Sequence, residues 1–187
     1  MPTETDKNGN GNGNEIELSE GELREIAGYA ADCARRVLTL FEQSLPADPR
    51  PREAIAAADA FAGGGRRTAA LRQSAWAAYK AAQEADATAT PAADAARAAS
   101  HAAAAGYLHP RASAHQVKHI LGAAAHAARA EELASGEDRQ VTAGTLDRAR
   151  RHAPPAVTAV LARLPAAPSG GGRVGELIRV LDAALRA

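Results

Sequence analysis

The chain has 187 residues, the length of one compact domain, and its 22 basic residues balance 22 acidic residues. A zero net charge argues against a nucleic-acid-binding protein, because binding to phosphates needs a concentrated positive field. The single cysteine, Cys33, excludes an internal disulfide. The sequence has no apolar run of bilayer length and no signal-like N-terminus. We therefore expect a cytoplasmic protein that spans no membrane.

Alanine dominates the composition, with 51 residues. Alanine is the best helix former, and its small side chain leaves little bulk between neighbouring backbones. The composition therefore predicts an all-α antiparallel bundle, or a short helical stack, of about seven closely packed helices. We expect residues 15–187 to form one domain behind a disordered tail at residues 1–14, which have no apolar periodicity.

The first helix is the clearest predicted element. Ser19 and Glu22 have the spacing of a capping box, apolar residues follow at helical intervals as far as Leu45, and Pro46 ends the helix. A turn at 48–53 opens a second helix, with Asp48 as its cap and an arginine paired to a carboxylate of helix one. The other helices are expected at about 66–86, 90–105, 113–133, 142–152, 155–164 and 174–185.

Two neighbouring aromatic residues, Trp76 and Tyr79, lie on the third predicted helix. They are more typical of core anchors than of an exposed platform, since the chain has few other bulky side chains. Alanine-rich walls would also leave room for them to line a cavity that binds a flat ligand.

The stretch from Leu23 to Phe61 resembles the immunity proteins of bacterial polymorphic toxin systems, in the immunity-protein-five-like group. Helix one, the Asp-Pro-Arg-Pro-Arg-Glu-Ala-Ile segment at 48–55 and the His-Ile-Leu-Gly-Ala-Ala segment at 119–124 carry the likeness. The chain departs from the pattern at Gly63–Gly65, where Gly-Glu is expected, and at Tyr29 and Phe61, where tryptophans are expected. The resemblance implies a small helical protein that neutralises a cognate toxin by binding it.

Five of the six histidines lie between residues 101 and 126. On a helix over 113–133, steps of 100° per residue place His115, His119 and His126 on one stripe, nearly opposite the larger apolar residues. Asp94, Arg97 and His101 share a face of the preceding helix. In a hairpin that turns near residue 109, His101 and His119 would lie at similar heights and could share a ligand.

Three interpretations of the histidines stay open. They can form a solvated polar face, a polar pocket with acid–base groups, or a metal site, although no zincin motif is present. For the pocket, we expect His101, His115 and His119 as catalytic residues, and Trp76, Tyr79, Asp94, Arg97 and His126 as binding residues, with no cofactor and no metal.

Two arginine clusters, at 66–67 and at 148–151, can be small anion or partner sites, although solvated helix ends are more typical. Cys33 lies in an amphipathic helix and is expected to be buried and inert.

Two functions follow from the sequence. The first is an immunity-type protein that binds a cognate toxin. The second is a small-molecule enzyme, or a self-resistance binder of a bacterial natural-product pathway, that uses the histidine pocket. A homodimer is compatible with either function.

Overall fold

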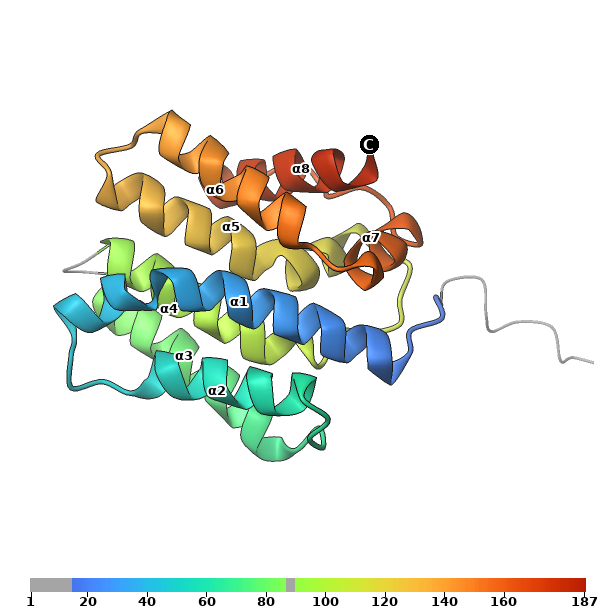
Figure 1. Cartoon of the computed structure of the whole chain (residues 1–187), viewed down its shortest axis with the longest axis horizontal. Coiled ribbons are helices and arrows are strands. Elements are labelled where there is room, and N and C mark those ends of the chain that lie inside the picture. The colour runs from blue at the N-terminus through green and yellow to red at the C-terminus, as the bar shows by residue number, and fades with distance from the viewer. Residues whose placement is uncertain (1–14, 87–89) are drawn as a thin grey trace, which may run out of the picture.

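The computed structural model describes residues 15–86 and 90–187, and the tail predicted over 1–14 lies outside them. Within the described residues there are eight α-helices and one short 3-10 helix (Figure 1), which confirms the all-α prediction. In chain order the elements are α1 (Glu20–Ser44), α2 (Arg50–Ala62), α3 (Ala69–Ala85), α4 (Thr90–Ala105), η1 (Ala114–Gln116), α5 (Val117–Ala134), α6 (Arg139–His152), α7 (Pro155–Ala162) and α8 (Gly172–Arg186).

Helix α4 lies at the centre of the structure and packs against α1, α2, α3 and α5. Ten of its sixteen residues are buried, and all of these except Asp94 are alanines. Four neighbours can approach one short helix in this way only because a methyl group is its largest common side chain. The predicted close contact between helices is therefore concentrated around α4.

Helix α1 crosses in front of α4 (Figure 1), and its sequence determines both of its ends. The Ser19 hydroxyl accepts a hydrogen bond from the backbone N–H of Glu22, and the Glu22 carboxylate accepts one from the Ser19 backbone, so the predicted capping box is confirmed. The helix ends at Ser44, just before Pro46. Its apolar stripe, including Ile26, Val37 and Phe41, is buried as predicted.

Two of the C-terminal helices, α6 and α8, pack on α5. Helix α6 runs beside α5, and α8 packs mainly on α5, as Figure 1 shows. A buried carboxylate joins α8 to this layer: Glu132 is 2 % exposed and is held by Arg129 at 2.7 Å and by Arg173. The last helix, expected at about 174–185, therefore docks on the body of the domain.

Three predicted helix starts are wrong. Helix α3 begins at Ala69 rather than at about 66, with Thr68 as its N-cap residue. Helix α5 begins at Val117 rather than at 113, because Ser113 caps the separate 3-10 turn η1. Helix α6 begins at Arg139 rather than at Thr142, since the Asp138 carboxylate accepts a hydrogen bond from the Gln140 backbone and caps the helix one turn earlier.

The predicted pairing of an arginine with helix one is confirmed, but Pro49 rather than Asp48 is the N-cap residue of α2. Arg52 pairs with Glu42 of α1 at 2.5 Å, and the Asp48 carboxylate accepts a hydrogen bond from the backbone N–H of Arg50 at 3.1 Å. Among the described residues, no helix combines the length and the apolar character that crossing a bilayer requires.

Candidate functional site

Polar residues predicted as a site meet between α4 and α5. His126 donates a hydrogen bond from Nδ1 to Oδ1 of Asp94 at 2.7 Å, and the Asp94 side chain is buried. Arg97 lies 3.9 Å from Asp94 and also pairs with Asp86. Three of the predicted binding residues therefore form one cluster, in which every charged group has a partner of opposite charge.

His101 belongs to the same cluster, because its ring stacks on His126 with centroids 5.2 Å apart. Its Nδ1 is enclosed and makes no hydrogen bond within residues 15–86 and 90–187. Burial is the main reason that the pKa of His101 is lowered to about 3, and the neighbouring His126 adds to the effect. His101 is therefore neutral at physiological pH.

The ring of His101 occupies space that only a glycine on α5 leaves free. A Cβ atom at position 122 would lie 2.5 Å from His101 Nδ1 and 2.8 Å from its Cγ. Because both atoms belong to the rigid ring, the ring could not move aside for a Cβ atom. The absence of a side chain at Gly122 therefore provides the space that the His101 ring occupies. The sequence places Gly122 on the histidine side of the helix, and the structure shows that it receives a ring there.

The other two predicted catalytic histidines are arranged differently from the expected stripe. His119 is half-buried on α5, and burial lowers its pKa, with Lys118 and His109 contributing. His115 is exposed in η1, outside α5, so the single helical stripe through His115, His119 and His126 is wrong. Within the described chain, no group of three or more His, Cys, Asp or Glu residues could hold a metal ion.

The aromatic pair of α3 lies on the surface, which corrects its interpretation as a core anchor. Trp76 is 58 % exposed and Tyr79 is 38 % exposed, and their rings stack at 5.4 Å. Lys80 lies 5.9 Å from the indole centroid. An open cleft of about 530 Å³ adjoins Trp76 and is also lined by Arg72 and Lys80. We call Arg72, Trp76, Tyr79 and Lys80 the α3 face.

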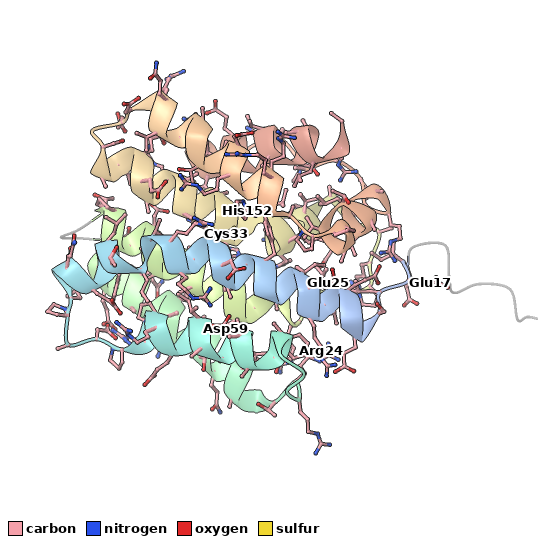
Figure 2. The ribbon with its side chains drawn as sticks, in the orientation of Figure 1. Glu17, Arg24, Glu25, Cys33, Asp59 and His152 are labelled. Carbon is pink, nitrogen blue, oxygen red and sulfur yellow. The ribbon has the colours of Figure 1, made fainter. Side chains whose placement is uncertain are left out.

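A second cavity, which the sequence did not indicate, lies between α1 and α6 above α5. It encloses about 40 Å³, and its walls include Tyr29, Cys33, Arg36, Arg148 and His152. Figure 2 labels Cys33 on α1 and His152 at the end of α6, two of the residues that line this cavity. Cys33 is buried, as predicted, and burial raises the pKa of its thiol to about 12, so it is not a thiolate at neutral pH. Residues more than 100 positions apart form this cavity, and no local motif joins them.

Comparison with known proteins gives one result. The profile of the Imm-5 like putative immunity protein family matches residues 17–153, well over half of the chain. No curated protein and no solved structure matches the chain. The matched region runs from just before α1 to just after α6, so it contains the α4 centre, the histidine cluster and the α3 face, while α7 and α8 lie beyond it. This chain therefore belongs to the Imm-5 like putative immunity protein family.

Proposed function

We propose that this protein neutralises a cognate toxin by binding it directly, and that the α3 face makes the contact. The observation that carries the proposal is the exposure of Trp76, the only tryptophan of the chain, stacked on Tyr79. Exposed aromatic rings lose little conformational entropy on binding and bury a large apolar area. For this reason tryptophan and tyrosine are enriched among the residues that dominate protein interfaces.

The charges beside Trp76 indicate an acidic partner surface. Arg72 and Lys80 line the cleft next to the indole, and no carboxylate of the described residues pairs with either of them. Arg50 also lines this cleft, but Asp48 and Glu84 hold it at 2.6 and 2.5 Å and offset its charge. The positive charge of Arg72 and Lys80 next to Trp76 suits a toxin surface rich in Asp and Glu, where complementary charge also accelerates association.

The test uses a candidate cognate toxin domain, which is to be sought among the proteins encoded next to the gene of this protein. The two proteins are produced together, and cell survival, the mass of the purified complex and its Kd are measured for wild type, Trp76→Ala and Lys80→Glu. Removing an aromatic residue at the centre of an interface costs about 2 kcal/mol or more, so we expect Trp76→Ala to weaken binding by at least roughly 30-fold.

The control is Val180→Ala, which alters an apolar residue on α8 that is 52 % exposed and far in sequence from α3. Its affinity should equal that of the wild type. If Trp76→Ala and Lys80→Glu protect cells and bind the toxin as well as the wild type does, the α3 face is not the binding surface. If the wild type forms no complex and gives no protection, the immunity function itself is refuted.

The predicted histidine pocket is a second candidate with less support from the geometry. Its favourable observation is the enclosed, unpartnered Nδ1 of His101. Against it, Gly122 lies so close to the His101 ring that no free space remains beside Nδ1. If His119→Ala removes protection while leaving stability and toxin binding unchanged, that result would favour a small-molecule role.

A further inference from the structure

We infer that the cleft between α1 and α6 binds a small organic carboxylate, with its carboxylate group in the enclosed cavity beside the Tyr29 hydroxyl and Arg36 and Arg148 supplying positive charge. This site is separate from the α3 face and does not depend on the proposed function.

The cavity contains a buried polar group whose one neighbouring partner is weak. Tyr29 is 4 % exposed, and its hydroxyl makes no hydrogen bond to a nitrogen or oxygen atom within residues 15–86 and 90–187. The Cys33 thiol beside it is only a weak acceptor. A buried hydroxyl without a partner costs free energy, and an acceptor oxygen placed in the cavity would remove that cost. Val37, Ala124, Ala127 and Ala149 form the apolar part of the wall, and Asp32, Arg36, Thr145, Arg148 and His152 form the rest.

The cavity has the size of a carboxylate group. A volume of about 40 Å³ holds roughly three water molecules, which is about the number of non-hydrogen atoms in a carboxylate. A wider, open cleft of about 600 Å³ adjoins it, and Arg36, Thr145 and Arg148 line both spaces. The rest of an organic acid can therefore lie in the open cleft while its carboxylate is enclosed.

The charges at the entrance suit an anion. Arg36 is exposed and Arg148 is half-buried, and neither forms an ion pair with a carboxylate of the described residues. Asp32 also lines the cavity, but Arg35 holds it at 2.5 Å. The remaining carboxylate is Glu131 of the open cleft, which accepts a hydrogen bond from Thr145.

Apart from Asp32, which is paired with Arg35, no group in the cavity wall is anionic. Burial raises the pKa of Tyr29 and of Cys33, so both keep their protons and can donate to an oxygen of the ligand. His152 donates from Nδ1 to the Arg148 carbonyl at 2.8 Å and adds no negative charge. A carboxylate would therefore meet proton donors inside and two guanidinium groups outside.

The test is an amide NMR titration of the full chain with sodium acetate, with sodium chloride and sodium sulfate as references at matched ionic strength. Acetate should cause saturable shifts at residues 29, 33, 145 and 148. Chloride offers no pair of acceptor oxygens, and sulfate brings a second negative charge and further oxygens for which the apolar walls at Val37, Ala124 and Ala127 provide no donor, so neither should produce these shifts. Shifts that do not saturate, or that sulfate produces equally well, overturn the proposal, because they indicate a nonspecific basic surface.

Variants locate the site. Tyr29→Phe preserves the ring shape and removes the hydroxyl, and Arg148→Gln removes one guanidinium group. Each should weaken acetate binding by about tenfold, which is the loss expected for one charge-assisted hydrogen bond.

The matched control is Arg151→Gln, which removes a charge from the same helix at a residue that pairs with Asp147 and lines neither space. Acetate affinities that are equal in wild type, Tyr29→Phe and Arg148→Gln would overturn the assignment. If Tyr29→Phe does not fold, Arg36→Gln takes its place with the same expectation. None of these variants alters the α3 face, so a negative result leaves the toxin-binding proposal untouched.

Discussion

Replacing Glu132 with glutamine should remove a large pH-dependent contribution to stability. The Glu132 carboxylate is 2 % exposed and joins α5 to α8 through Arg173, with Arg129 as a second partner at 2.7 Å. The hydrogen bonds from Arg173, followed by those from Arg129, lower the pKa of Glu132 from 4.5 to about 2 against the opposing effect of burial.

The magnitude follows from linkage between proton binding and folding. One pKa unit corresponds to about 1.4 kcal/mol, so a fall from 4.5 to about 2 amounts to about 3 kcal/mol of stability. Because the pKa is lower in the folded than in the unfolded chain, this stability is present above pH 4.5 and is lost as the pH falls towards 2. Glutamine keeps the shape but carries no charge, so Glu132→Gln should lack this contribution at every pH.

Urea unfolding at pH 7, 5, 4 and 3 measures the effect. At pH 7 the variant should be less stable than the wild type by about 3 kcal/mol, and the difference should narrow steadily below pH 4.5. Glu176→Gln is the control, because Glu176 pairs with the same Arg173 at 2.9 Å but its side chain is 53 % exposed. An exposed ion pair contributes at most about 1 kcal/mol. A difference between wild type and Glu132→Gln that stays constant from pH 7 to 3 would refute the linkage.

Two further substitutions test the packing and the capping of helices. Gly122→Ala gains about 1 kcal/mol of helix propensity but places a Cβ atom 2.5 Å from the His101 ring, and overpacking costs about 1–3 kcal/mol. We therefore expect Gly122→Ala to lower the Tm in thermal unfolding. The control is Gly144→Ala, which has nothing within 4 Å of the new Cβ atom and should raise the Tm. A higher Tm for Gly122→Ala would contradict the close fit. Ser19→Ala removes the cap of α1 and should lower the free energy of unfolding by about 1 kcal/mol in urea, and an unchanged value would show that the capping box is dispensable.

Local chemistry made the helix boundaries predictable only where one residue could act as the cap. Ser19 and Pro46 bound α1 without competition, and both ends were predicted correctly. Before α6, both Asp138 and Thr142 are good capping residues, and the sequence does not decide between them. Asp138 takes the position because the helix gains a further turn. Before α5, Ser113 caps a 3-10 turn, which has the same cap signal as an α-helix.

The site was harder to predict because alanine faces give no signal of burial. Helix α3 places Ala75, Ala78 and Ala82 inside and Trp76 outside, and methyl groups on both sides leave the helical wheel ambiguous. The close approach of α3 to α4 leaves no space for an indole, so the bulky ring is excluded from the core. Similarly, the contact of His101 with Gly122 depends on how α4 and α5 are rotated about their axes relative to each other, and a single sequence does not predict that rotation.

The nine buried alanines of α4 limit which amino-acid substitutions this protein can accept. Enlarging any one of them would press on neighbouring helices in an interior that is already filled, so the centre tolerates almost no growth. The outward side of α3 carries no such restriction, and residues there can be exchanged without moving a backbone. Substitutions on the outward side of α3 can therefore accumulate without disturbing the helices that pack around α4.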